Sequence, residues 1–237
     1  MADLHRLLDV QDRDLALDQL RHRRDTLPDR AALAGHQQTI ARIDKELATL
    51  TEQLTELTRA QKKLEDEIGI VDTKAAAETK KLNSGTITAP REIQALSDEI
   101  DALGRRKRAL EDDELELMEQ AEPLSADVER LEGERAAAAT EADRLGAAIA
   151  EQERVIDTEA AALQAERDAA AADIPDELLA RYEKLRAKLD GVGVARLQGD
   201  LCLGCHVSLP AMEVDAIRHA PEGTVVTHEE CGRILVR

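Results

Sequence analysis

Two long stretches of the chain repeat apolar residues at alternating spacings of three and four. The first runs from Ile40 to Leu82, where eleven of the thirteen positions in this register are Ile, Leu, Val or Ala. The second runs from Ile93 to Leu163, where sixteen of twenty-one positions are apolar. A heptad pattern of this length places a narrow apolar seam on one helix face, and that seam needs a partner helix. The pattern therefore predicts two long helices in a coiled coil.

The segment between the two patterns reads LNSGTITAPRE. Asn83 and Gly85 are turn formers, and Pro90 cannot continue a helix that began before it. Pro90 suits the first turn of the next helix, where the carboxylate of Glu92 would face the positive end of the helix dipole. We expect the chain to reverse near residues 83–90. The two arms then match in length and cover each other's seam as an antiparallel hairpin.

The alternative arrangement is a parallel dimer of two open rods. Lys107, Glu114 and Arg135 occupy seam positions, and as buried charges we expect them to set the register in either arrangement. The matched arms and the central turn favour the hairpin, and with it a monomer. A dimer remains the second possibility.

The pattern changes again beyond the second arm. Pro28 predicts an interruption in the first arm, Asp173 and Pro175 announce a further helix, and Gly191 ends it. The remainder is rich in Gly and short apolar segments. It is too small to form a stable core without a cross-link such as a disulfide or a bound metal. We expect a mostly α fold: a long antiparallel coiled-coil helical hairpin followed by a small C-terminal domain. The expected boundaries are the hairpin at 1–172, a connecting helix at 173–190 and the C-terminal domain at 191–237.

Composition narrows the functional classes. The chain has no Phe or Trp and one Tyr, which disfavours a large aromatic core. Its formal net charge of −18 argues against broad attraction to nucleic acid or an anionic membrane. No stretch is apolar enough to span a membrane, and the first twenty residues lack a signal-peptide pattern. We therefore expect a cytoplasmic protein whose cysteines stay reduced.

All three cysteines lie near the C-terminus, in two pairs of metal-binding spacing. Cys202 and Cys205 form one pair, and His228 and Cys231 form the other. Zinc takes four tetrahedral ligands from thiolate and imidazole groups, and a gap of two residues lets one tight turn present both side chains. Four protein ligands leave no open position. The pattern predicts one structural Zn²⁺ that folds the module and does not activate water.

Three histidines compete for the fourth ligand position. His206 directly follows Cys205, and adjacent residues seldom reach one tetrahedral ion together. His219 lies in the helix expected after Pro210, without a partner at metal spacing. His228 alone stands where a cysteine would complete the second pair. The bland alternative is that the cysteines fill a small core and His228 is a surface residue.

These features resemble a bacterial family of coiled-coil hairpin proteins with a C-terminal zinc ribbon, often described as nucleic-acid-binding zinc-ribbon proteins. The turn KKLNSGTITAPREIQALSDEI, the stretch RALEDDELELME and the segments CLGCHVSLP and CGRILVR carry the resemblance. The family pattern has four cysteines, so His228 is a substitution. Some members are associated with an alternative sigma factor or with flagellar or secretion systems, although nothing in this sequence encodes such a partner.

The sequence contains no recognisable catalytic motif, which favours a protein that is not an enzyme. We expect a zinc-binding adaptor that presents a coiled-coil tip and a zinc ribbon to protein partners, in transcription or a related regulatory assembly. The partner itself is unidentified. The candidate partner-binding residues of the tip are Asn83, Gly85, Pro90, Arg91 and Glu92.

Nucleic-acid binding is the alternative function. Folding the hairpin brings two groups of basic residues together in a belt below the tip. Neighbouring carboxylates could neutralise this belt through exposed ion pairs of little energetic weight, and the ribbon offers no aromatic side chain to stack a base. The candidate phosphate-binding residues are Lys62, Lys63, Arg105, Arg106 and Arg108.

Overall fold

The computed structural model describes residues 2–221 and 223–237. By their contacts, the residues form two compact units. One unit is Ala32–Arg144, and the other combines Met1–Ala31 with Leu145–Arg237. Each unit is described by itself below.

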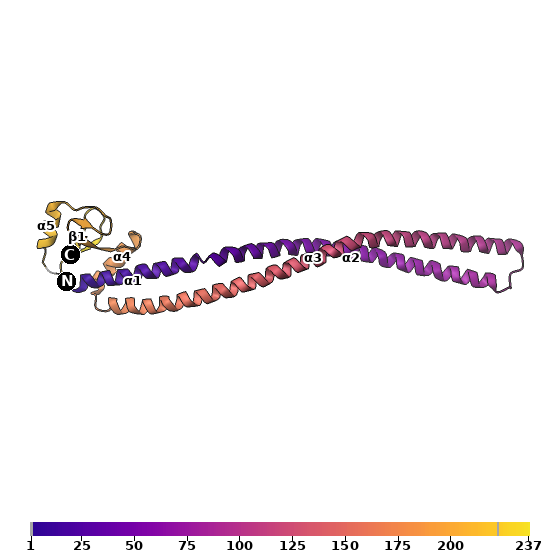
Figure 1. Cartoon of the computed structure of the whole chain (residues 1–237), viewed down its shortest axis with the longest axis horizontal. Coiled ribbons are helices and arrows are strands. Elements are labelled where there is room, and N and C mark those ends of the chain that lie inside the picture. Colours follow the sequence, from indigo (N-terminus) through magenta and orange to yellow (C-terminus); the bar gives the residue numbers. More distant parts are fainter. Residues whose placement is uncertain (1, 222) are drawn as a thin grey trace. The chain divides into compact units, whose positions relative to one another are not determined.

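The unit Ala32–Arg144 is a two-helix hairpin. It contains most of α2 (Pro28–Asn83) and the first part of α3 (Pro90–Ala171). The two helices run side by side in opposite directions and are joined by the turn after Asn83 (Figure 1). The predicted antiparallel hairpin is therefore confirmed. Helix α3 continues through Pro123, whose missing N–H leaves no break in the helix.

The apolar seam lies where the heptad pattern placed it. Ile43 of α2 and Leu110 and Leu131 of α3 are almost fully buried, and each occupies a position of the predicted register. Most other seam residues are half-buried, because a pair of helices covers each seam from one side only. Burial of this stripe, and not intrinsic helix propensity, provides most of the stability of such long helices.

The expectation of buried charges in the seam was wrong, because Lys107 and Glu114 are only half-buried and Arg135 is exposed. Lys107 and Arg135 extend their long side chains out of the seam and reach carboxylates of α2. Lys107 pairs with Asp72, and Arg135 pairs with Asp44, each at 2.5 Å. Both cations are partly exposed, so these pairs tie the helices together without the desolvation cost of a buried charge.

The turn at the tip of the hairpin is held by short-range hydrogen bonds. The Ser84 hydroxyl donates to the carbonyl of Lys81 at 2.7 Å and lies 2.7 Å from the Thr86 hydroxyl. Gly85 has φ +69°, a left-handed conformation that suits glycine. Pro90 begins α3 as predicted, where the absence of its N–H costs nothing.

The second unit gathers helices around the C-terminal part of the chain. Helix α1 (Ala2–Asp25) ends before Pro28, as the proline predicted. It lies beside the last part of α3, to which the Arg13–Glu166 and Arg24–Asp157 ion pairs tie it. A short break after Ala171 leads into α4 (Asp176–Lys188).

The ribbon contains a four-stranded sheet and one helix. The elements are β1 (Val194–Gln198), β2 (Leu201–Cys202), α5 (Ala211–His219), β3 (Val226–Thr227) and β4 (Ile234–Val236). The strand order is β2-β1-β4-β3, with β1 and β4 parallel and the other pairs antiparallel. Helix α5 confirms the helix expected after Pro210.

Two apolar clusters lie on this sheet. The base core joins the sheet to α1, α4 and the end of α3, with Leu7, Tyr182, Val194 and Val236 at or near full burial. The ribbon core joins it to α5, and includes Cys202, Leu209, Val214 and Leu235. Val236 belongs to the base core and the adjacent Leu235 to the ribbon core. Strand β4 therefore sends successive side chains into different cores, as the pleat of a strand requires.

Polar groups also join α1 to the ribbon. The buried side chain of Gln11 accepts a 2.8 Å hydrogen bond from the backbone N–H of Val194, the first residue of β1. Within the described residues, no helix is both long and apolar enough to cross a lipid bilayer.

Candidate metal centre

Four side chains from two separate turns converge beside the ribbon core. The Sγ atoms of Cys202, Cys205 and Cys231 and a ring nitrogen of His228 all lie within 4.8 Å of one another. The Nδ1 atom of His228 is 3.0 Å from the Cys231 sulfur and 3.3 Å from the Cys205 sulfur. Bond lengths to tetrahedral zinc imply a separation of roughly 3.5 Å between such ligand atoms. The cluster therefore has the size of a zinc site.

The two turns have the same backbone hydrogen bonds. In the first turn, the N–H of His206 donates to the carbonyl of Cys202, whose own N–H donates to the carbonyl of Val207. In the second, the N–H of Gly232 donates to the carbonyl of His228, whose N–H donates to the carbonyl of Arg233. His228 thus occupies the same place in its turn as Cys202 does in the other. This equivalence supports His228 as the fourth ligand.

The residue that follows each pair has a left-handed backbone. Gly232 has φ +73° and His206 has φ +59°. Glycine adopts this conformation readily, whereas a residue with a Cβ atom does so at a cost of about 1 kcal/mol or more. The first turn therefore contains a strained residue at the position where the second turn has glycine. His206 itself is not a candidate zinc ligand in this structure, because its side chain lies outside the ligand cluster.

Backbone amides support two of the sulfurs. The N–H of Val207 is directed at Cys205 and that of Arg233 at Cys231, two residues beyond each cysteine. Burial raises the pKa of the Cys205 thiol to about 11 in spite of its amide. Burial also acts to raise the pKa of Cys231. Hydrogen bonds with Arg233, His228 and Cys205 outweigh this effect and lower the pKa of Cys231 to about 7. Cys231 is therefore the thiol more readily converted to a thiolate ligand.

Gly204 makes room for a side chain that fastens the second turn. A Cβ atom at this position would lie 2.6 Å from Cδ of Arg233 and 2.8 Å from Cβ of Ala195. The Arg233 guanidinium passes this gap and donates to the carbonyls of Val192 at 3.0 Å and Leu189 at 3.5 Å. The sequence pattern did not identify Arg233. Its position, two residues beyond the last cysteine, was the only available signal.

The other histidines lie away from the cluster. His219 is exposed on α5 and pairs with Asp215, and His206 is exposed beside Cys205. His228, in contrast, is fully buried. Its Nε2 atom is also buried and has no hydrogen-bond partner among the described residues. Ligand imidazoles commonly donate this second nitrogen to an acceptor, whereas the ring of His228 is held by its packing and by the contacts of Nδ1 with the two sulfurs.

The predicted tip residues lie together at the end of the hairpin. Asn83 is the last residue of α2, Gly85 lies in the turn, and Pro90, Arg91 and Glu92 begin α3. All five are exposed. The structure thus brings this group together on one turn.

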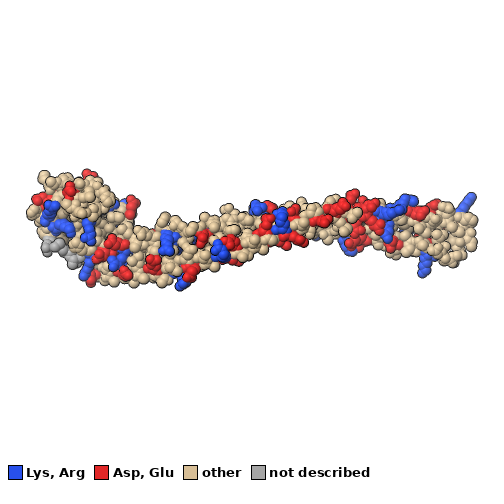
Figure 2. Space-filling model, viewed as in Figure 1, with Lys and Arg blue, Asp and Glu red and all other residues tan. Residues whose placement is uncertain are grey.

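The predicted basic belt is partly occupied by ion pairs. Lys62 pairs with Glu65 and Asp66 of its own helix, and Arg106 reaches Glu67 across the hairpin at 3.4 Å. The pKa of Lys62 is raised, chiefly by its hydrogen bond to Glu65. Figure 2 shows blue and red side chains interspersed along this part of the surface. The remaining three belt residues form no ion pair among the described residues: Lys63, Arg105 and Arg108.

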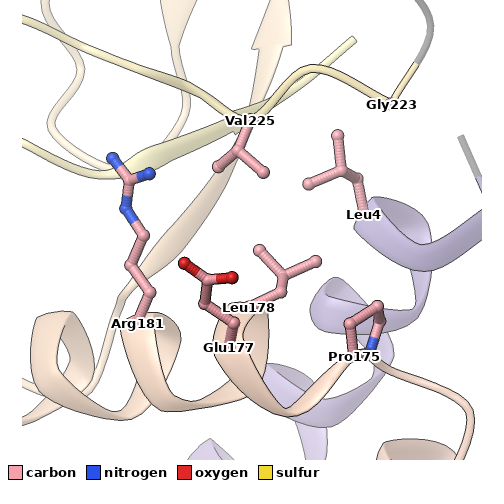
Figure 3. A pocket seen from close by; sticks show the side chains of 7 residues that line it. All are labelled: Leu4, Pro175, Glu177, Leu178, Arg181, Gly223 and Val225. Carbon is pink, nitrogen blue, oxygen red and sulfur yellow. The ribbon is translucent and has the colours of Figure 1, made fainter.

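A hollow lies beside the base core, at the edge of the ribbon. It has a volume of about 340 Å³ and is lined by Leu4, Leu178 and Val225, whose side chains approach one another from α1, α4 and the segment before β3 (Figure 3). Glu177 and Arg181 stand on one side of it. None of its lining residues belongs to the metal cluster.

Comparison with known proteins places this arrangement in a class. Residues 10–190 match the model of the CT398-like coiled coil hairpin domain, and residues 201–235 match that of the C4-type zinc ribbon domain. The fold and the site together define a coiled-coil hairpin protein with a zinc ribbon. The chain belongs to the CT398-like coiled-coil hairpin family, as the resemblance of its turn and ribbon predicted.

Similar proteins match this chain over nearly the whole of their length. The protein Rv2229c of Mycobacterium tuberculosis is 33% identical over 239 residues, which cover 100% of this chain and 96% of the relative. A solved structure from Mycobacterium smegmatis has a TM-score of 0.84 at 26% identity, and covers 100% of this chain and 99% of the other. CT398 from Chlamydia trachomatis has the same fold, with a TM-score of 0.70 at 21% identity and coverage of 98% and 96%.

The metal assignment follows from the cluster and the ribbon family together. The ribbon model is of the four-cysteine type, and this chain supplies three cysteines and His228 at the corresponding turns. The protein binds one structural zinc ion. Three thiolates and a neutral imidazole give the zinc site a formal charge of −1, where four thiolates would give −2.

Proposed function

We propose that this protein is a non-enzymatic, cytoplasmic adaptor that presents its coiled-coil tip and its zinc ribbon to protein partners, in transcription or a related regulatory assembly. The closed metal cluster supports a structural role for zinc, because four protein ligands leave no position for substrate or water. The two family models describe a hairpin and a ribbon, and neither describes an enzyme.

The observation that carries the proposal is the chemistry of the tip. Arg91 and Glu92 are exposed, and neither forms an ion pair within the part of the chain that the structure describes. Ile93 follows them with 40% of its surface exposed. The turn before them is ordered by its own hydrogen bonds, so the backbone of Arg91, Glu92 and Ile93 has a fixed position at the tip. Unpaired opposite charges beside an exposed apolar side chain suit a specific protein contact.

Affinity purification from the native cell tests this proposal. The wild-type chain is compared with Arg91→Glu/Glu92→Lys, which exchanges the two charges and leaves the net charge unchanged. Each lysate is divided, and one half is treated with RNase. We expect a protein partner that survives RNase, co-elutes with wild type and is lost from the tip variant. Retention of every partner by the tip variant would exclude the tip as an interface.

A matched control separates the tip from general changes in charge. Lys45→Glu/Glu52→Lys makes the same exchange on α2, where both side chains are exposed and unpaired among the described residues. This control is expected to retain the partner. Circular dichroism of both variants should match wild type, because neither variant removes an ion pair of the described hairpin and the exposed contact of Glu92 with the helix dipole contributes less than about 1 kcal/mol.

Nucleic-acid binding is the second candidate. It is favoured by the three belt residues Lys63, Arg105 and Arg108, which are exposed and have no carboxylate partner within the described residues. The Arg106–Glu67 pair places the two halves of the belt at nearby levels of the hairpin. Such cations can bind phosphates, with an affinity that falls as salt rises.

Fluorescence anisotropy with labelled RNA and duplex DNA over a salt series distinguishes this candidate. If the belt binds phosphate, affinity should fall with salt and should weaken in Arg105→Gln/Arg108→Gln. Binding that is absent, or unaffected by both salt and substitution, would eliminate the belt as a phosphate site. The tip variant should leave this binding unchanged.

A further inference from the structure

The second helix of the hairpin exposes an apolar pair inside an acidic segment. Leu115 has 54% of its surface exposed and Met118 has 53%. They lie three residues apart on α3, so their side chains are neighbours on the helix surface. They belong to the EDDELELME stretch that carries part of the family resemblance, yet neither the seam, the tip nor the zinc site uses them.

These two residues form a second, shorter seam. Glu111, Leu115, Met118 and Glu122 follow one another at spacings of four, three and four, the spacing of a coiled-coil contact line. The main seam of α3 passes instead through Leu110, Glu114 and Leu117, which are less exposed. We call the face formed by Glu111, Leu115, Met118 and Glu122 the acidic seam. It presents two apolar side chains with a carboxylate at each end.

The surrounding charge is almost entirely negative. Residues 109–125 contain seven Asp or Glu and no Lys or Arg. The neighbouring α2 segment, residues 51–67, contains five acidic and three basic residues, and Lys62 is already paired with Glu65 and Asp66. Figure 2 shows the red side chains gathered over this part of the hairpin on the face in view. Of the acidic residues in 109–125, only Glu111 has an ion-pair partner among the described residues, Lys107 at 3.9 Å.

We propose that the acidic seam is a docking site for a short cationic amphipathic helix of another protein. Apolar side chains of that helix would pack on Leu115 and Met118, and its Lys or Arg residues would meet Glu111 and Glu122. Flanking charges of this kind set partner choice in coiled coils. Nucleic acid is excluded as the occupant by the sign of the charge. A second copy is disfavoured, because two acidic seams placed face to face would oppose carboxylate to carboxylate.

This proposal goes beyond the function proposed above, because it concerns neither the tip nor the ribbon. Its probe is a synthetic amphipathic peptide of Leu and Lys, about 14 residues or four helical turns long, with one Trp at its end. The protein contains no Trp, so the fluorescence anisotropy of the peptide reports binding directly. The second ligand is a peptide of the same composition in scrambled order. The full-length, zinc-loaded chain is used throughout.

The apolar part is tested with Leu115→Ala/Met118→Ala. The control is Ile70→Ala/Val155→Ala, which truncates two other exposed apolar side chains, 69% and 47% exposed. Loss of the two apolar contacts should weaken binding about tenfold, and the control should bind like wild type. Circular dichroism verifies that the variants remain helical. Equal affinity of the two variants, or no binding by wild type, would overturn the proposal.

The charged part is tested with Glu111→Gln/Glu122→Gln against Asp101→Asn/Glu132→Gln. Both variants lose two negative charges from α3, but only the first changes the acidic seam. At about 0.1 M salt the first should weaken binding and the second should change it little. The control charges lie ten residues from the acidic seam, roughly 15 Å along the helix, which is beyond the Debye length of about 10 Å.

Three further results would also refute the proposal. The charge variants could be equally weakened, the scrambled peptide could bind as well as the amphipathic one, or sedimentation could show a self-association that Leu115→Ala/Met118→Ala abolishes. The last would assign the seam to a second copy. The tip variant Arg91→Glu/Glu92→Lys should keep full peptide affinity, so failure of this inference and failure of the proposed adaptor function are distinguishable.

Discussion

The hydroxyl of Tyr182 donates a 2.8 Å hydrogen bond to the carboxylate of Asp14 in the interior of the base core. The donor lies on α4 and the acceptor on α1, so one bond joins the two helices that flank the ribbon sheet. Asp14 also pairs with Arg167 of α3 at 3.2 Å and lies 3.7 Å from Arg186. Burial, then the bond to Asp14, raises the pKa of Tyr182. A charged network therefore organises a core that has only one aromatic side chain.

We predict that this network is sensitive to which partner is removed. Tyr182→Phe should lower the free energy of unfolding of its unit by about 1 kcal/mol, because a single hydrogen bond is lost. Asp14→Ala should cost more, about 3 kcal/mol, because it leaves the buried Tyr182 hydroxyl without its acceptor and leaves Arg167 and Arg186 with only their more exposed carboxylate partners. Urea denaturation followed by circular dichroism measures both. A larger effect of Tyr182→Phe than of Asp14→Ala would contradict this account.

The identity of the fourth zinc ligand gives the second prediction. His228→Cys should retain one zinc per chain, because the turn already has the backbone of a cysteine pair. His228→Ala should weaken zinc binding by more than about 100-fold, since even an outer-shell contact can be worth that factor. Competition with a chromophoric chelator provides the affinity, and elemental analysis provides the stoichiometry. His219→Ala, which alters an exposed histidine outside the cluster, is the matched control; weakening by this control as large as that of His228→Ala would refute the assignment.

The left-handed residues of the two turns give the third prediction. His206→Gly should stabilise the ribbon by up to about 1 kcal/mol, because glycine relieves the strained backbone. Gly232→Ala should destabilise it by a similar amount, although its Cβ would meet no atom within 4 Å. Thermal unfolding of the zinc-loaded protein measures both shifts. Effects of the same sign in the two variants would be inconsistent with backbone strain as the cause.

Zinc removal should affect the ribbon core more than the hairpin. Thiolates and imidazole bind protons as the pH falls, so acid should release zinc, and a chelator should do the same at neutral pH. Without zinc, we expect faster amide hydrogen exchange in the two turns and α5, which pack in the ribbon core. Exchange in α2 and the first part of α3 should be unchanged. Mass spectrometry of peptides from chelated and zinc-loaded protein measures this, and uniform acceleration along the chain would show that the metal holds more than the ribbon.

The hairpin and the cluster were predictable because each depends on a local spacing. A heptad repeat states which face of a helix must be covered, and the turn residues state where the chain reverses. Paired Cys-x-x-Cys and His-x-x-Cys segments place the ligands on tight turns. Ile43, Leu110 and Leu131 were all located by their register alone, and their burial confirms it.

The base core was not predictable, because its contacts join residues far apart in the sequence. Nothing near Asp14 indicates that its carboxylate is buried, since its partners Arg167, Tyr182 and Arg186 come from other elements. The hydrogen bond from the backbone N–H of Val194 to the side chain of Gln11 is equally invisible in a repeat pattern. The prediction of buried charges at Lys107 and Arg135 was wrong for a related reason. A repeat identifies the Cα position of a residue, whereas a long side chain can carry its charge several ångströms away to a carboxylate.

The sharing of strand β4 between two cores has a consequence for biosynthesis. Leu7 and Val236 are packed in one cluster, so the cover that α3 and α4 give to α1 is completed only after β4 has been translated. Throughout that interval, part of the apolar surface formed by Leu4, Leu7 and Leu8 stays exposed to chaperones, to other nascent chains and to the hairpin itself. A ribosome that stalled after α4 would leave this surface open, and zinc could not repair it, because the residues that close it follow the final metal ligand.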